Sequence, residues 1–269
     1  MNANLFLKEM KLNLLSFTLW TAVITILISA TMMLYPVFME NQSQIFGMMK
    51  LLPEGALQFK GISDLTDILS VIGFYSANNV IYMMLLGSIF AIVLSSNILL
   101  KEEYDKTAEY LLTRPVTRKE TFISKLSVLA VYVLLLNLIT SLAGFTSMMI
   151  FKDAPFNIVS FLILSLYTLL LNCVFGAAGL FISTLVRKPK SITALCIALV
   201  LVFYFVDTIS KITEDVYWIG YASPFPYVDI KVAGPDYHLN MWHLVYFTGL
   251  SLIFILSALH LYNRKDIYV

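Results

Sequence analysis

The amino-acid sequence predicts an all-α polytopic membrane protein with six transmembrane helices, in a single domain over residues 1–269. The first observation is composition: 59% of the residues are hydrophobic and only 13% are charged, against roughly 45–50% apolar and 25% charged in soluble domains. The second is that the apolar residues gather in runs of about 20, which is the length of a helix that crosses a bilayer. Together these observations exclude a water-soluble globular enzyme.

Each of six apolar stretches is long enough to cross the hydrocarbon core of a membrane. Every backbone polar group in hydrocarbon needs an internal partner, so a spanning segment is either a helix or a strand of a closed barrel. Barrel strands alternate in hydrophobicity over about ten residues, and these stretches are longer and continuously apolar. The six predicted helices cover residues of about 14–37, 80–100, 126–150, 158–186, 192–210 and 243–262.

The distribution of positive charge predicts the orientation. Thirteen of the eighteen Lys and Arg residues lie in the N-terminal segment, the second and fourth connections and the C-terminal tail. By the positive-inside rule both termini and these connections are cytoplasmic, and the segments near 38–79, 151–157 and 211–242 are outside. The net charge is only +1, so no overall field attracts nucleic acid, which we do not expect as a partner.

The connection from Lys101 to Lys125 is the one sizeable cytoplasmic segment. Apolar residues recur in it at i, i+4, i+7 and i+8, which predicts a short amphipathic helix between the second and third spans. Pro115 lacks a backbone donor and disfavours helical geometry in the residue before it, so this helix ends there. The residues of the apolar stripe are Tyr104, Ala108, Leu111 and Leu112.

A second helix is predicted to start directly after this proline. Thr117 stands three residues before Glu120, and this spacing is typical of a capping box, in which each side chain bonds the backbone N–H of the other residue. We expect the helix that begins here to run without interruption into the third span.

The connecting segment resembles one family, the permease subunits of type-2 ABC exporters. These permeases have an acidic residue at the end of the second span, then a pattern like E-x-G-T-x-E-x-L-L-S-x-P-V-S-R, and then a Lys. Lys106 occupies the place where the family usually has Gly. The matching residues here are Glu103, Thr107, Glu109, Leu111, Leu112, Thr113, Pro115, Val116, Thr117, Arg118 and Lys125.

The resemblance implies that this segment is a coupling helix, which sits in a cleft of a separate cytoplasmic ATPase and carries its motion into the membrane. An apolar anchor with a polar rim suits such docking. The alternative is an amphipathic helix on the lipid surface, but five of its eleven charged residues are acidic. The residues implied to contact the ATPase are Glu103, Thr107, Glu109, Leu111, Leu112, Arg114, Pro115 and Arg118.

The chain itself is expected to be non-catalytic. None of its glycines begins the G-x-x-x-x-G-K-[ST] run that cradles nucleotide phosphates, and its histidines form no H-E-x-x-H pair for a metal. The resemblance therefore implies that ATP and Mg²⁺ bind to a partner ATPase, and that this chain holds no cofactor. Six spans are half of the usual twelve, so two permeases, identical or different, and two ATPase subunits are expected.

Three polar residues inside the spans are candidates for a substrate path. Asn137 and Asn172 lie near the middle of the third and fourth spans, where they can either hydrogen-bond across helices or line a path. Asp207 is expected near the outer end of the fifth span, where its carboxylate can reach water or contact a cation. Small residues at intervals of four predict close helix approach; they are Gly87, Ala91 and Ser95 on the second span, with Gly179 and Ser183 on the fourth.

Two flanking segments are expected at the membrane interfaces. Mixed apolar and charged residues over 5–12 predict a short interfacial helix before the first span. Aromatic residues around Pro224 and Pro226 predict that the last outer segment returns to the membrane surface.

The main hypothesis is a permease subunit of an ATP-driven exporter that moves a hydrophobic or amphipathic substrate outward: a drug, a lipid-like molecule or a peptide antibiotic. The resemblance also implies the inner (plasma) membrane of a prokaryote. One alternative is a membrane scaffold that recruits a cytoplasmic protein without transport. Another is an ion-coupled secondary transporter, which the shortage of charged residues within the spans disfavours.

Overall fold

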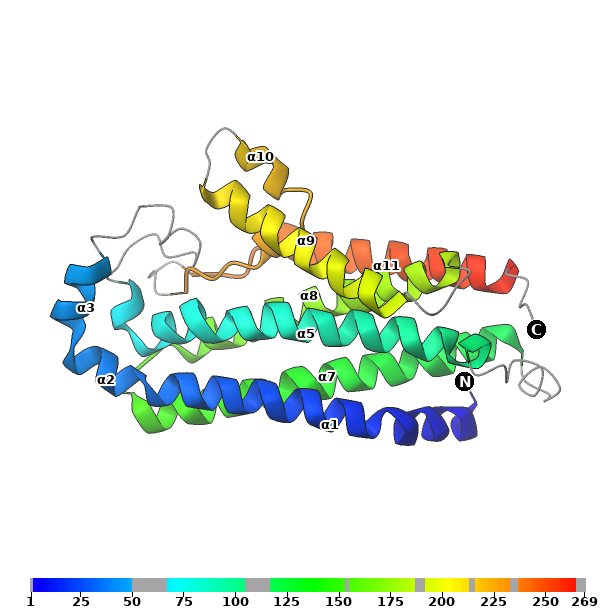
Figure 1. Ribbon diagram of the computed structural model, residues 1–269, viewed down its shortest axis with the longest axis horizontal. Helices are drawn as coiled ribbons and strands as arrows, with labels where there is room; N and C mark the ends of the chain where they lie inside the picture. Colours follow the sequence, from blue (N-terminus) through cyan, green and yellow to red (C-terminus); the bar gives the residue numbers. More distant parts are fainter. Residues whose placement is uncertain are drawn as a thin grey trace.

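Six long helices make up most of the structure (Figure 1). The computed structural model describes residues 2–49, 67–104, 117–152, 155–186, 192–212, 216–232 and 237–264, and these ranges contain no strand. The six helices are long and apolar enough to cross a membrane, which confirms the predicted fold class. They are α1 (Ala3–Met33), α5 (Val71–Tyr104), α7 (Arg118–Phe151), α8 (Ile158–Leu185), α9 (Ile192–Ile212) and α11 (Met241–Arg264).

Short helical segments flank these spans. α2 (Tyr35–Glu40) and α3 (Gln42–Met49) follow α1, and η1 (Asp67–Leu69) precedes α5. α10 (Tyr217–Gly220) and η4 (Phe225–Tyr227) lie between α9 and α11.

The N-terminal segment does not form a separate interfacial helix, so that expectation was wrong. α1 runs unbroken from Ala3 to Met33. The Asn2 side chain caps its start by accepting hydrogen bonds from the backbone N–H groups of Asn4 and Leu5, at 3.1 and 3.2 Å. No Gly or Pro occurs before Pro36, so no residue that breaks helices lies within α1. Pro36 itself lies in the first turn of α2, where a proline is compatible with the start of a helix.

α5 begins at Val71 rather than near residue 80. Ser70 Oγ accepts a hydrogen bond from Gly73 N at 3.1 Å, as a capping residue does. The polar residue Asn78 in this first part of the helix donates from Nδ2 to Phe74 O at 3.0 Å. Because the side-chain amide of Asn78 is hydrogen-bonded within its own helix, α5 continues past this residue.

α5 is the central helix of the bundle. It packs along α8 and also contacts α1, α7 and α9, so it lies between α9 on one side and α1 and α7 on the other (Figure 1). Its side chains are buried along nearly its whole described length. α1 packs along α7, and α11 packs along α8, so these two helices cover the outside.

Small residues let α5 and α8 approach closely, as their spacing in the sequence predicts. A methyl group added at Gly179 of α8 would lie 2.1 Å from Ser95 Oγ and 2.5 Å from the Ile92 backbone oxygen of α5. One added at Gly87 of α5 would lie 2.7 Å from Asn172 Nδ2 of α8. These contacts leave no room for a side chain at either glycine.

The beginning of α1, the beginning of α7 and the end of α11 meet at one end of the bundle, which we call the termini end (Figure 1). Asn2 N donates to Ser124 Oγ of α7 at 2.9 Å, and Arg118 Nη1 of α7 donates to the Asn263 backbone oxygen of α11 at 3.4 Å. The first and the last of the six long helices thus have their outer ends, at Ala3 and Arg264, at the same end of the bundle, as expected for an even number of spans.

At the other end of the bundle, the segment between α9 and α11 folds back onto the helices. Phe225 is fully buried, and its ring centre lies 5.3 Å from that of Phe175 of α8 and 5.6 Å from that of Tyr204 of α9. Tyr227 stacks on Tyr246 of α11 with ring centres 4.0 Å apart. These aromatic contacts hold the segment against the membrane-spanning helices.

We predict that Gly179→Ala destabilises the bundle, whereas Gly249→Ala does not. A methyl group at Gly179 collides with the backbone of α5, and overpacking of this kind costs roughly 1–3 kcal/mol. Gly249 of α11 has nothing within 4 Å of the added carbon, so only the gain in helix propensity remains. Thermal unfolding of the two purified variants in detergent measures the difference; equal transition temperatures would contradict the close contact.

Candidate functional site

The predicted ATPase-contact segment joins two membrane helices at the termini end. Glu103 lies in the last turn of α5, and Arg118 is the first residue of α7. Both ends of the segment are thus attached to spanning helices, so a displacement of the segment acts on two helices at once. The remaining predicted contact residues lie outside the described residues: Thr107, Glu109, Leu111, Leu112, Arg114 and Pro115.

The capping box predicted at the start of α7 is confirmed. Thr117 Oγ1 accepts a hydrogen bond from Glu120 N at 3.2 Å, and Glu120 Oε2 accepts one from Thr117 N at 2.9 Å. From this cap α7 runs without a break to Phe151. The helix that leaves the connecting segment is therefore the same helix that crosses the membrane.

Lys125, at the end of the predicted connection, is not exposed to solvent. It lies in the second turn of α7, is fully buried, and donates from Nζ to the Ile98 backbone oxygen of α5 at 2.5 Å. The buried ammonium ties α7 to α5.

Further contacts fix the first half of α7 to the other helices of the termini end. The rings of Phe122 and Tyr262 of α11 lie 5.7 Å apart, and the Tyr132 hydroxyl donates to the Met10 backbone oxygen of α1. With the Lys125 bond to α5, α7 is attached to three other helices near its start. A displacement of α7 at Thr117 is therefore transmitted to α1, α5 and α11 as well.

Asn137 and Asn172 meet in the interior of the bundle. Asn172 Nδ2 of α8 donates to Asn137 Oδ1 of α7 at 3.4 Å, and Ser88 Oγ of α5 donates to Asn172 Oδ1 at 3.2 Å. Asn137 Nδ2 donates in turn to the Val133 backbone oxygen at 2.8 Å. All three side chains are buried, so they form a polar chain that links α5, α8 and α7 and that meets the hydrogen-bonding needs of amides in hydrocarbon.

The structure places Asp207 apart from this polar chain. Asp207 lies in the last two turns of α9, and its Oδ2 accepts a hydrogen bond from Lys211 Nζ at 2.7 Å. The residue is only 3% exposed, so its carboxylate does not face water as expected but is held by a lysine of the same helix. Within the described residues, no group of three or more His, Cys, Asp or Glu side chains could hold a metal ion.

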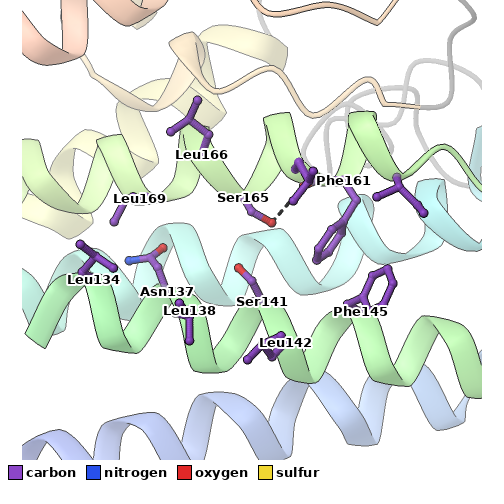
Figure 2. A pocket seen from close by; sticks show the side chains of 12 residues that line it. Leu134, Asn137, Leu138, Ser141, Leu142, Phe145, Phe161, Ser165, Leu166 and Leu169 are labelled. Carbon is purple, nitrogen blue, oxygen red and sulfur yellow. Dashed lines mark hydrogen bonds between the residues drawn. The ribbon is translucent and has the colours of Figure 1, made fainter.

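An apolar groove of about 450 Å³ lies between α7 and α8, and Asn137 forms part of its wall (Figure 2). The sequence gives no signal for this groove, because a groove depends on how two helices are rotated and how far they diverge. Its lining is otherwise mainly leucine and phenylalanine, with two serines that face it from opposite walls (Figure 2). Lining residues on α7 include Leu134, Leu138 and Leu142, and those on α8 include Leu162, Leu166 and Leu169.

The comparison with protein families agrees with this architecture. The family model of the ABC-2 family transporter protein matches residues 3–267. The chain belongs to the ABC-2 transporter family. The match extends over all six long helices of this ABC-2 transporter protein, so the resemblance first seen in the connecting segment holds along the chain, which is a multi-pass membrane protein. No curated protein matches the sequence.

We predict that Asn137 and Asn172 are energetically coupled. A double-mutant cycle with Asn137→Ala and Asn172→Ala should give a coupling energy of about 0.6–1.7 kcal/mol, the range for hydrogen bonds between membrane helices. The free energy of unfolding in mixed micelles provides the measurement.

The control cycle pairs Asn172→Ala with Asn78→Ala, because among the described residues Asn78 donates to Phe74 O of its own helix and shares no partner with Asn172. A coupling energy near zero in both cycles would contradict the polar chain.

Proposed function

We propose that this ABC-2 transporter protein is the non-catalytic permease subunit of an ATP-driven exporter in the inner (plasma) membrane of a prokaryote. The observation that carries the proposal is the family match over residues 3–267. In this proposal two such permeases, identical or different, assemble with two cytoplasmic ATPase subunits. ATP and Mg²⁺ bind to the ATPase subunits, and hydrolysis there drives the transport.

The coupling step is proposed to act through the segment between α5 and α7. Leu111 and Leu112 form the apolar anchor, and Glu109, Arg114 and Arg118 form the polar rim that contacts the ATPase. Two observations support this role. The capped start of α7 is continuous with the membrane span, and the Lys125 bond ties it to α5, which in turn contacts α8 and α9.

The proposed substrate is hydrophobic or amphipathic: a drug, a lipid-like molecule or a peptide antibiotic. The apolar interior of the bundle and the groove between α7 and α8 support this class. The coupled asparagines remain a proposed polar element of the path, since Asn137 borders the groove and Asn172 lies behind it.

We predict that an ATPase with a G-x-x-x-x-G-K-[ST] motif co-purifies with the chain from its native membrane, and that Leu112→Asp weakens this association. Loss of a central apolar anchor costs roughly 2 kcal/mol, which corresponds to about 30-fold weaker binding. The ATPase bound per permease is measured by quantitative mass spectrometry.

The matched control is Lys8→Asp, which places the same new carboxylate on an exposed position near the start of α1 at the termini end. If the Leu112→Asp and Lys8→Asp variants recover equal amounts of ATPase, the segment does not form part of the interface with the ATPase. Failure to recover any ATPase would favour a scaffold or an ion-coupled transporter.

We predict that the termini end faces the cytoplasm. Lys119 at the start of α7 and Lys231 at the opposite end are both exposed, so Cys introduced at either site can react. A membrane-impermeant maleimide added to intact cells should label the Lys231→Cys variant and spare the Lys119→Cys variant until the cells are opened. The unmodified chain is the control, since Cys173 and Cys196 lie within spans; the reverse pattern would refute the orientation.

A further inference from the structure

The groove between α7 and α8 occupies one half of the membrane thickness. Its wall on α7 extends from Leu134 to Phe145, which is roughly 16 Å along a helix at 1.5 Å per residue. The hydrocarbon core of a bilayer is about 30 Å thick, so the groove is as long as one leaflet is deep. Because α7 starts at the termini end with Arg118, the groove lies in the half of the bundle remote from that end.

The walls of the groove suit a hydrocarbon chain. Leu138 and Leu162 flank it from the two helices and are 49% and 59% exposed, so their side chains face the lipid. Two of its polar side chains are already bonded to protein: Asn137 to Val133 O and Asn172, and Ser165 Oγ to Phe161 O at 2.9 Å. Ser141 and Ser165 face the groove from opposite walls, and their small size gives it width (Figure 2).

The end of the groove near Phe145 and Ile158 leads to the connection between α7 and α8. Lys152, which ends α7, is exposed there, and the N-terminus of α8 carries the positive end of its helix dipole. Both favour a phosphate at the level of the lipid headgroups. Asp153 follows Lys152 in the sequence and offsets part of this charge, so the fit of the chain in the groove must supply most of the binding.

The size of the groove favours a lipid chain over a helix of another protein as its occupant. An α-helix with its side chains is about 10–12 Å across and cannot enter a groove of about 450 Å³ over its whole length. A volume of this size is typical of a small-molecule site. Left empty, the lining side chains would lose the van der Waals contacts that hold helices together in a membrane.

We propose that this groove binds one acyl chain of a phospholipid from the leaflet remote from the termini end. The chain lies along Leu138 and Leu162, with its end at Asn137 and its headgroup near Lys152. This inference requires that the protein spans a membrane, and it does not depend on the export function. Because both the groove and the surrounding lipid are apolar, binding comes from shape and packing, and the bound lipid exchanges with the bilayer.

The test uses the full chain reconstituted in nanodiscs that contain a phospholipid with a photoreactive diazirine on one acyl chain. After illumination, mass spectrometry should find more cross-links in residues 134–145 and 158–169 than on the lipid-exposed side chains of α1, such as Leu15 and Leu19. Leu138→Trp fills the groove and should lower the cross-linking about tenfold, or about 1.4 kcal/mol.

The matched control is Ile139→Trp, the next residue of α7, which is 37% exposed and does not line the groove. A second pair on α8, Leu162→Trp against Val159→Trp, repeats the test if the first pair fails to fold; Val159 is exposed and lies outside the groove. Equal cross-linking on α1 and in the groove, or equal loss in both members of a pair, would overturn the proposal. A disulfide between two copies of the Leu138→Cys variant would assign the groove to a second permease and would also overturn it.

Discussion

Hydrocarbon offers no hydrogen-bond partner to a peptide group, and the architecture of this transporter protein follows from that constraint. Several polar side chains of α5 obey it as the backbone does. Asn78, Ser95 and Ser96 each donate to a carbonyl oxygen one turn back in α5. Because lipid is as apolar as the helix surfaces, the helices are held together by close contact and hydrogen bonds between helices rather than by exclusion of water, and the close approach of α5 and α8 at Gly179 is one such contact.

The central position of α5 links this packing to the proposed mechanism. α5 contacts α1, α7, α8 and α9, and its last described turn leads into the segment expected to bind the ATPase. α7 leaves the same segment and is bonded to α5 through Lys125. A rigid pair of helices that share one attachment point can move as a unit, whereas two independent helices would absorb a displacement by bending.

The sequence predicts the features that depend on a few neighbouring residues or on the thickness of the membrane. The start of α7 follows from two residues three positions apart, Thr117 and Glu120, and the number of spans follows from the length of the apolar runs. Features that depend on tertiary contacts were misjudged. Lys125 was counted with the cations of a connection, and its burial could not be predicted because its partner, the Ile98 carbonyl, is distant in sequence.

The candidate site was predicted only in part for a related reason. Asn137 and Asn172 stand out as single polar residues, but their pairing depends on the rotation of α7 against α8. An apolar helix that is hydrophobic on every side shows no stripe that fixes this rotation, unlike an amphipathic helix of a soluble protein. Ser88, which completes the polar chain, and the groove beside Asn137 depend on the same rotation.

The position of α5 between four other long helices also has a consequence for the order in which the helices are synthesised and packed. Of its four neighbouring long helices, only α1 precedes α5 in the chain, so α5 enters the bilayer before α7, α8 and α9 have been synthesised. During that interval the hydroxyls of Ser95 and Ser96 are hydrogen-bonded to carbonyls of their own helix, whereas Ser88 and Asn97 acquire their partners only when Asn172 of α8 and Thr193 of α9 have been made. The hydroxyls of Ser95 and Ser96 are therefore satisfied before the later helices arrive, and the arrival of α8 and α9 supplies the partners of Ser88 and Asn97.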